Sequence, residues 1–401
     1  MAVINTFLGP TLQIYTTSKC NMKCAHCASR FQRMPDMSND VFLDILKHAY
    51  NCGIKRIELF GNDPLLHPKI KEQIRMLNDH SYDYAICTVG ASPEKKDTER
   101  LFWDIVGSID NRKGGVVFSV DCTEKTAIDV LESDILGVDN SYAFKALTFW
   151  RYAGLLKKMG ISARTNTVIS RYNINDVNKI IRRVVEMGFA TSFCFVQHCQ
   201  MDFENLKDKG LIGELRDKFY EYLLSTNILE RQQIDKIIEE AEKIVSAGKL
   251  EKGGPFNCFR GFDSSESEVD LLELQTIRTE LLNLKNETSG GLVLPNDDFI
   301  LDVGNKGFGC LELLRQEKYP QMKVDSRGRM TFCCDLHDPL TQTFSIKDFG
   351  NTSMREAFLK NILSNPYIWL CCYFNPCDFS VNRVGYDTKL EEVKTDDIPT
   401  K

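Results

Sequence analysis

No stretch of the 401-residue sequence approaches the run of about 20 apolar residues that a membrane-spanning helix needs. The first residues lack the basic region, apolar core and cleavage site of a secretory signal, so we expect a cytoplasmic protein. The formal net charge of -6 excludes a global positive field that would attract nucleic acid. Neither a membrane nor a nucleic acid is therefore an expected partner.

Cysteine, by contrast, is abundant. The chain has fifteen cysteines, and without an export signal we do not expect them to form a disulfide framework. In a reducing compartment such a number suggests metal or cluster binding, together with some thiols buried in the core. Three cysteines lie near the N-terminus, and the rest include a C-terminal group: Cys310, Cys333, Cys334, Cys371, Cys372 and Cys377.

The N-terminal group is Cys20, Cys24 and Cys27, spaced as C-x3-C-x2-C. Three thiolates in one short loop can hold three corners of an iron–sulfur cube and leave the fourth iron open. Electron-transfer ferredoxins close the cluster with four cysteines, and structural zinc also takes four ligands. A surface zinc site or a redox-active cysteine cluster is the alternative. An open iron would indicate chemistry at the cluster.

The first half of the chain alternates strand and helix patterns. We predict strands at residues 12–16, 56–60, 84–88, 116–121, 163–169 and 192–196, and helices at 39–51, 68–77, 95–106, 143–158 and 176–187. Such alternation predicts a parallel sheet with outer helices. Six strands are too few for a closed eight-stranded barrel, so residues 1–202 are expected to form a partial, TIM-like (β/α)6 barrel of the α/β class. The active site of such folds lies at the C-terminal ends of the strands, where the cysteine loop follows the first strand.

The rest of the chain divides into three further parts. Residues 203–300 are charged and are expected to form a bridge or lid, or else a plain spacer. Their pattern predicts three amphipathic helices, at residues 213–228, 230–247 and 272–286. Residues 301–386 predict a small cysteine-rich α+β domain that contains a β-hairpin turning at Gly328. Residues 387–401 are charged and poor in apolar side chains, which is typical of a loose tail.

The cysteine run of Cys20, Cys24 and Cys27 resembles the cluster motif of the radical S-adenosylmethionine (radical SAM) enzymes. The resemblance implies a [4Fe–4S] cluster whose open iron binds S-adenosylmethionine. One electron from the cluster then cleaves this cofactor to methionine and a 5′-deoxyadenosyl radical, which abstracts a hydrogen atom from the substrate. A one-electron reductant, such as a flavodoxin or a ferredoxin-like protein, is the implied partner.

A second motif supports this resemblance. The family carries a glycine-glycine-glutamate-proline run after the second strand, where it contacts the amino group of S-adenosylmethionine. This chain has Gly61-Asn62-Asp63-Pro64 there, so the second glycine and the glutamate are replaced. Aspartate keeps a carboxylate acceptor on a shorter arm. The alternative is an ordinary loop with a helix-starting proline.

Polar residues near the ends of the fourth and fifth strands are further cofactor candidates. They are Ser119 and Asp121 after one strand, and Asn166 and Ser170 on the next. In the family such residues contact the methionine or ribose portion of the cofactor. Each of them could instead cap a strand end.

The C-terminal cysteines resemble those of the twitch or SPASM extension, which holds auxiliary [4Fe–4S] clusters. Ligands for one such cluster would be Cys310, Cys333, Cys371 or Cys372, and Cys377. Adjacent cysteines point in different directions, so one auxiliary cluster is favoured over two. A zinc site remains the alternative, since zinc commonly takes four cysteines.

Three scattered cysteines, Cys122, Cys194 and Cys199, lie at or near predicted strand ends. A thiol at the barrel mouth could donate a hydrogen atom to a substrate radical, but free cysteine is also a common core residue.

The resemblance to the twitch or SPASM extension implies a ribosomal peptide or protein as the substrate, modified by crosslinking, epimerisation or a similar change. Dehydrogenation or rearrangement of a small molecule is the alternative, and a non-catalytic iron–sulfur or zinc scaffold is a remote one. The chain starts shortly before its first strand, so we expect no peptide-recognition domain ahead of the barrel.

Overall fold

The computed structural model describes the barrel in most detail. The described residues are 11–22, 24, 34–51, 54–80, 82–90, 96–132, 140–170, 173–195, 220, 224, 230–247, 271–287, 322–331 and 344–345. Within these ranges no helix combines the length and the apolar character needed to cross a membrane.

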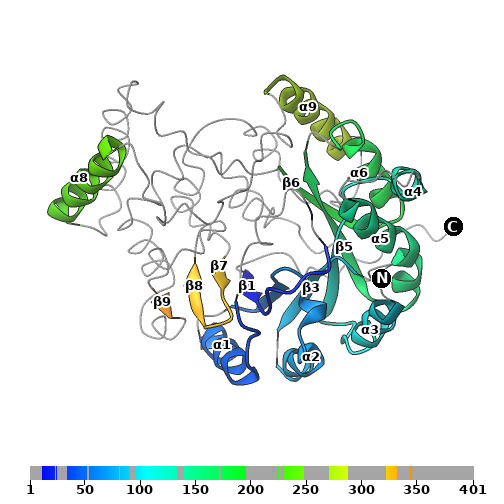
Figure 1. Ribbon diagram of the computed structural model, residues 1–401, viewed down its shortest axis with the longest axis horizontal. Coiled ribbons are helices and arrows are strands. Elements are labelled where there is room, and N and C mark those ends of the chain that lie inside the picture. Colours follow the sequence, from blue (N-terminus) through cyan, green and yellow to red (C-terminus); the bar gives the residue numbers. More distant parts are fainter. Residues whose placement is uncertain are drawn as a thin grey trace.

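A single nine-stranded sheet organises the described residues (Figure 1), in the order β6-β5-β4-β3-β2-β1-β7-β8-β9. All six predicted strands are confirmed, and each pairs in parallel with its neighbour in sequence. Their bounds are β1 Thr11–Tyr15, β2 Arg56–Phe60, β3 Asp83–Thr88, β4 Gly114–Ser119, β5 Ser162–Ile169 and β6 Ala190–Phe195. The α/β partial barrel expected from the sequence is therefore present.

Helices cover the outer, convex side of this sheet (Figure 1). The five predicted barrel helices are confirmed, and α4 (Glu124–Glu132) is an additional helix that the sequence reading missed. The bounds of the five are α1 Asn39–Asn51, α2 Ile70–Asp79, α3 Lys96–Val106, α5 Ser141–Lys158 and α6 Val177–Glu186.

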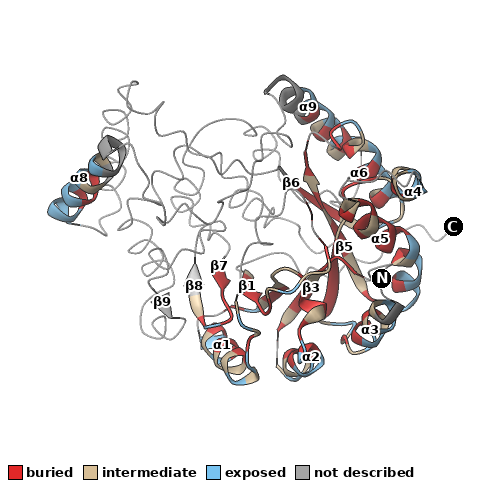
Figure 2. Cartoon of the chain, in the orientation of Figure 1, coloured by how far each residue is buried: buried red, intermediate tan, exposed pale blue. Residues whose placement is uncertain are grey.

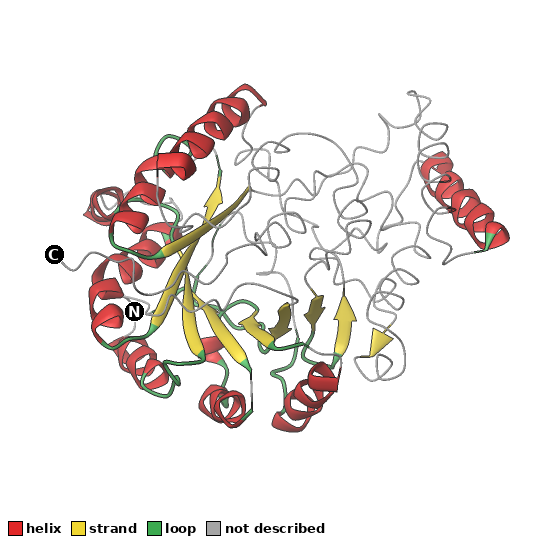
Figure 3. Ribbon diagram, turned by 180° about the vertical axis from the view of Figure 1, so that it is seen from behind, coloured by secondary structure: helices red, strands yellow, loops and turns green. Residues whose placement is uncertain are grey.

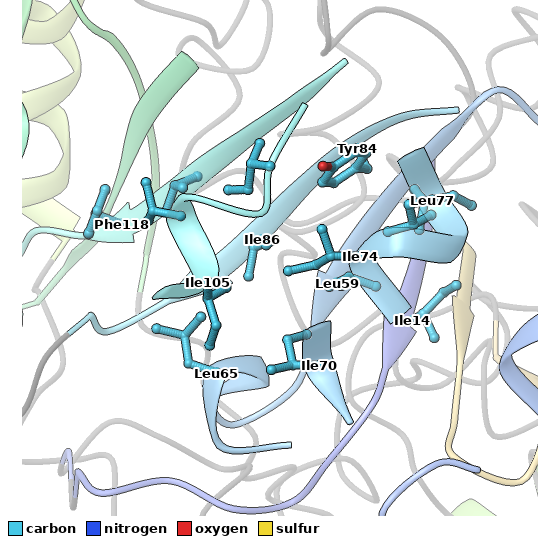
Figure 4. Close-up of a cluster of buried hydrophobic side chains, with 14 of the residues drawn as sticks. Ile14, Leu59, Leu65, Ile70, Ile74, Leu77, Tyr84, Ile86, Ile105 and Phe118 are labelled. Carbon is cyan, nitrogen blue, oxygen red and sulfur yellow. The ribbon is translucent and has the colours of Figure 1, made fainter. Parts of the chain in front are cut away.

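Apolar side chains alternate along the strands and face these helices. Ile14, Leu59 and Ile86 lie on successive strands opposite Ile74 of α2 (Figure 4), and all four are almost completely buried. Figure 2 shows the same division, with buried residues toward the sheet and exposed residues on the outer helix surfaces. Because each such side chain contributes roughly 1.5–3 kcal/mol on burial, this layer supplies much of the stability of the barrel.

The helix α9 (Leu271–Glu287) confirms one predicted helix of the bridge, and α8 (Arg231–Ala247) confirms another. The third, predicted between residues 213 and 228, lies almost wholly outside the described residues. Ile277 and Leu281 of α9 pack against Val177 and Ile181 of α6 in a buried cluster. The helix α9 therefore packs beside α6 on the outer wall of the barrel. The bridge or lid expected of residues 203–300 stays a prediction.

The predicted C-terminal hairpin is also confirmed. Strands β7 (Met322–Val324) and β8 (Arg329–Thr331) pair antiparallel, and Gly328 between them has φ +77. The hairpin does not start a separate sheet. Strand β7 pairs in parallel with β1, and β9 (Phe344–Ser345) follows β8 at the far edge (Figure 3). The barrel sheet thus has a seventh parallel strand that the sequence did not reveal.

Candidate functional site

The cysteine loop leaves the sheet at the end of β1, and its two ends are tied together there. Asp36 accepts hydrogen bonds from Thr17 Oγ1 at 2.7 Å and from Lys19 Nζ at 2.6 Å. Burial works to raise the pKa of Asp36, but the hydrogen bonds from Lys19 and Thr17 outweigh it and lower that pKa. The charged carboxylate therefore joins residues that precede the loop to residues that follow it.

Two of the three predicted cluster ligands lie within the described residues, and they lie together. Cys20 is half-buried and Cys24 is buried, neither is in a disulfide, and both pack near Met22 and Val89. The Met22 amide donates a hydrogen bond to Cys20 Sγ at 3.3 Å. This soft donor set, in an apolar setting with an N–H bond to sulfur, fits an iron–sulfur cluster. Cys27 lies outside the described residues, within which no three His, Cys, Asp or Glu side chains form a metal-binding group.

The Gly61–Pro64 loop lies directly against the residues that precede Cys20. Gly61 has φ +120, and a Cβ atom at this position would lie 2.8 Å from the carbonyl oxygen of Thr17, so only glycine fits. The Asp63 amide donates to the carbonyl oxygen of Lys19 at 2.9 Å. The structure thus brings together the two motifs that the resemblance selected.

The side chain of Asp63 is 1% exposed. Its Oδ1 atom accepts hydrogen bonds from Thr88 Oγ1 at 2.8 Å and from the Leu65 amide at 3.2 Å, and so it caps the short helix η2 (Pro64–Leu66). Burial raises the pKa of Asp63 to about 7, although both hydrogen bonds oppose this rise. Asp63 and Pro64 thus start a short helix, as the alternative of an ordinary loop with a helix-starting proline expects. Contact of Asp63 with a cofactor stays a prediction.

Ser119, the last residue of β4, lies side by side with Asn166 within β5. They are register partners on β4 and β5, and Asn166 is in turn the register partner of Ser192 on β6. Ser192 Oγ donates to Asn166 Oδ1 at 3.0 Å. Sequence reasoning missed Ser192, because its place beside Asn166 depends on the register between β5 and β6.

Asp121 and Ser170 have well-defined structural partners. Asp121 forms a buried ion pair with Lys145, with Nζ and Oδ2 at 2.5 Å, and accepts the Val168 amide at 2.8 Å. The Ser170 amide donates to Asn173 Oδ1 at 2.8 Å. These contacts fasten the ends of β4 and β5 to each other and to α5, as the strand-capping alternative expects.

Of the three cysteines predicted as hydrogen-atom donors, the structure describes the side chain of Cys122 only. Cys122 is 1% exposed in the core, and burial raises the pKa of its thiol to about 12, which favours core packing. Cys194 lies on β6 in register with Val168, but its side chain lies outside the described part. Cys199 and the predicted auxiliary ligands Cys310, Cys333, Cys371, Cys372 and Cys377 also lie outside it.

Sequence reasoning missed three features of the inner face. Cys87 on β3 is half-buried and is not in a disulfide. Below the strand ends, Arg164 of β5 forms a buried ion pair with Glu58 of β2, and Gln13 of β1 donates to the same carboxylate. Lys323 of β7 is also buried, with Nζ 5.9 Å from the ring centroid of Tyr15. Charged residues in otherwise apolar strands were the available signal for this inner layer.

Comparison with known proteins agrees with this geometry. Residues 14–102 match the model of the radical SAM superfamily, a range that contains the cysteine loop and the Gly61–Pro64 loop. Residues 14–102 therefore form a radical SAM domain. Such a domain implies a [4Fe–4S] cluster and S-adenosylmethionine as cofactors.

Curated relatives are distant. GTP 3′,8-cyclase of Helicobacter pylori is 21% identical over 88% of this chain and 89% of its own length. GTP 3′,8-cyclase of Sulfurimonas denitrificans is 23% identical over 52% of this chain. PqqA peptide cyclase of Methylorubrum extorquens is 21% identical over 43% of this chain. The match spans 63% of the Sulfurimonas protein and 42% of the Methylorubrum protein.

Solved structures share the fold. Streptococcus suis SuiB bound to S-adenosylmethionine has a TM-score of 0.54 at 11% identity, covering 88% of this chain and 67% of its own. SuiB bound to the precursor peptide SuiA has a TM-score of 0.51 at 12% identity, covering 91% and 72%. At such identities the likeness concerns the fold alone.

Proposed function

We propose that this protein is a radical SAM enzyme that removes a hydrogen atom from a ribosomally made peptide or protein and so modifies it by crosslinking, epimerisation or a similar change. One observation carries the enzymatic part of the proposal. Cys20 and Cys24 lie at the carboxyl edge of the sheet, and the Gly61–Pro64 loop is hydrogen-bonded to the residues immediately before them. This is the edge where parallel α/β folds place their active sites.

In this proposal Cys20, Cys24 and Cys27 hold the cluster as thiolates. When bound, the cluster and S-adenosylmethionine would supply the electron and the 5′-deoxyadenosyl radical that takes a hydrogen atom from the substrate. The chain's own residues position the cofactors and shield them from water. Gly61, which has no side chain, lets its loop approach Thr17, shortly before Cys20. The buried, apolar Met22 and Val89 keep water from the sulfur atoms.

The cofactor would lie along the carboxyl edge. Asp63 would receive its ammonium group, in addition to capping η2, because a positive charge would relieve the burial cost of the carboxylate. Ser119 and Asn166, adjacent in register, would accept or donate hydrogen bonds to its polar portion. Asp121 and Ser170 would act behind them by holding the strand ends in place.

A peptide substrate is supported by two of the similar proteins, SuiB in complex with its precursor peptide SuiA and PqqA peptide cyclase. A small-molecule substrate is the second candidate, favoured by the GTP 3′,8-cyclase that aligns with 88% of this chain. The two candidates share the cofactor site and differ in what lies over the inner face. Deoxyadenosine formation stimulated by a precursor peptide, but not by GTP, would support the first candidate, and the reverse would support the second.

Three further parts of the proposal concern partners and surroundings. An auxiliary [4Fe–4S] cluster on Cys310, Cys333, Cys371 or Cys372, and Cys377 would take up an electron or orient the substrate. A flavodoxin or ferredoxin-like protein would supply the first electron. A reducing, cytoplasmic compartment is the third part of the proposal, because cluster ligands need thiols that are not oxidised to disulfides.

The test is anaerobic reconstitution of the wild type and of a Cys20→Ala/Cys24→Ala/Cys27→Ala variant, with iron and sulfide counted. A Cys122→Ala variant is the matched control, because this thiol lies in the core. We expect the triple variant to lose about four irons and all deoxyadenosine formation, while the control keeps both. If the wild type and the triple variant bind equal amounts of iron, the cluster assignment is wrong.

A further inference from the structure

Asn62 occupies the position where the resembled motif has its second glycine. Its side chain is half-buried, and Nδ2 donates a hydrogen bond to the carbonyl oxygen of Ser18 at 2.5 Å. Ser18 lies two residues before Cys20, at the start of the cysteine loop. Glycine has no side-chain donor and could not make this contact.

This hydrogen bond continues the pairing of β1 with β2 beyond both strands. The Thr16 amide donates to the Phe60 carbonyl oxygen at 3.3 Å, and the Asp63 amide donates to the Lys19 carbonyl oxygen at 2.9 Å. Between these two hydrogen bonds, the Asn62 side chain donates to the Ser18 carbonyl oxygen. Backbone carbonyls in a partly buried loop need donors, and here an amide side chain supplies one where no ladder hydrogen bond exists.

Residues 17–19, which lead into the cysteine loop, are also hydrogen-bonded to Met34 and Asp36, which follow the loop. Ser18 Oγ donates to the Met34 carbonyl oxygen at 2.9 Å, and Asp36 binds Thr17 and Lys19. Ser18 is thus held from two directions, by its hydroxyl on one side and by its carbonyl on the other. Releasing the carbonyl would let the peptide between Ser18 and Lys19 rotate.

Such a rotation would change the orientation of Cys20. The orientation of this residue sets the hydrogen bond from the Met22 amide to Cys20 Sγ, at 3.3 Å. Hydrogen bonds to sulfur tune the electronic properties and the reduction potential of iron–sulfur clusters. A change at Asn62 would therefore reach the cluster without touching any ligand.

We propose that Asn62 is a positioning residue for the cluster-binding loop, acting through the Ser18 carbonyl on Cys20. The proposal rests on the cluster assignment made above. It also accounts for the departure from the glycine of the family motif, because the asparagine replaces backbone freedom with a hydrogen bond that anchors the loop.

The test compares two variants of the full, anaerobically reconstituted chain. Asn62→Gly installs the residue of the family motif, and Asn62→Asp keeps the shape of the side chain but presents an acceptor to the Ser18 carbonyl. The control is Asn78→Ala, which removes a hydrogen bond from Asn78 Nδ2 to the Ser108 carbonyl, at 2.9 Å, far from the cysteine loop. The readouts are the rate of cluster loss to an iron chelator and the electron paramagnetic resonance spectrum of the reduced cluster.

Both Asn62 variants should lose the cluster about fivefold faster than the wild type, the factor expected for one hydrogen bond, and show shifted g values. The control should melt at a lower temperature yet keep the wild-type rate and spectrum. Wild-type behaviour of Asn62→Asp would overturn the proposal, because it would show that the donor does not matter. If the Cys20→Ala/Cys24→Ala/Cys27→Ala variant keeps the wild-type spectrum unchanged, with no signal lost, the cluster assignment is overturned, and this proposal with it.

Discussion

Asp63 gives the sharpest test of the site, because its burial and its proposed contact with the cofactor predict opposite effects for Asp63→Asn. The carboxyl group is 1% exposed, and burial raises its pKa to about 7. An unfolded aspartate has a pKa of about 3.9, so the folded state binds the proton more tightly than the unfolded state. The contribution of Asp63 to stability is therefore fully present below pH 4 and is lost as the pH rises to about 7.

The size of this effect follows from the shift of about three pKa units. Relative to a group that stays neutral in both states, the raised pKa of Asp63 lowers the unfolding free energy by about 1.5 kcal/mol at pH 5 and about 4 kcal/mol at pH 8. Asparagine stays neutral and can still accept the hydrogen bonds of Thr88 and Leu65 through its own Oδ1. The gain in stability of Asp63→Asn should therefore grow by about 2.5 kcal/mol between pH 5 and pH 8.

Urea unfolding of the full chain at both pH values, without S-adenosylmethionine, measures this difference. Asp104→Asn, which changes an exposed carboxylate in an ion pair with Lys71, serves as the control and should alter stability by less than about 1 kcal/mol at either pH. A gain that is equal at pH 5 and pH 8 would refute the argument from burial. The same Asp63 variant should bind S-adenosylmethionine at least about tenfold more weakly, because it loses a charged acceptor for the ammonium group.

Three other substitutions test the remaining parts of the structure. Arg164→Met strands the buried Glu58 carboxylate and should lower the unfolding free energy by about 3–5 kcal/mol, while adding Glu58→Gln should recover part of this loss in the same urea assay. Gly61→Ala places a Cβ atom against a backbone carbonyl at φ +120 and should cost about 3 kcal/mol, whereas Gly154→Ala, which meets nothing within 4 Å in α5, should gain about 0.5–1 kcal/mol; equal effects would contradict the strain argument. Cys122→Ala should leave both deoxyadenosine and substrate product unchanged by mass spectrometry, because the thiol lies in the core; loss of product alone would restore it as a hydrogen-atom donor.

The arrangement of the barrel could be predicted from sequence because its signals are local. Apolar strands bounded by polar turns, alternating with amphipathic helices, specify a parallel α/β sheet without knowledge of any long-range contact. The same reasoning failed where neighbours far apart in sequence decide the outcome. Strand β7 joins β1 through a register of three residue pairs, and α9 packs on α6, and neither segment carries a pattern that names its partner.

The site was predictable to the same extent and for the same reason. The cysteine spacing and the Gly61–Pro64 run are local, and the structure brings them together through backbone hydrogen bonds. The pairing of Arg164 with Glu58 spans 106 residues and depends on the register of the strands between them, so the sequence alone shows only unexplained charges in apolar strands.

The two replacements in the family motif are best understood as one change. Asn62 and Asp63 are adjacent, and both bind residues just before Cys20. The Asn62 side chain donates to the Ser18 carbonyl oxygen, and the Asp63 backbone amide donates to that of Lys19. The shorter acid at position 63 folds back to accept the Leu65 amide and so fixes the loop from within. Combining Asn62→Gly with Asp63→Glu would restore the family residues at both positions. If the two positions act as a unit, the double variant should retain its cluster better than the sum of the single effects predicts, by a coupling of about 0.5–3 kcal/mol. Strict additivity in the rates of cluster loss would show that the two replacements are independent.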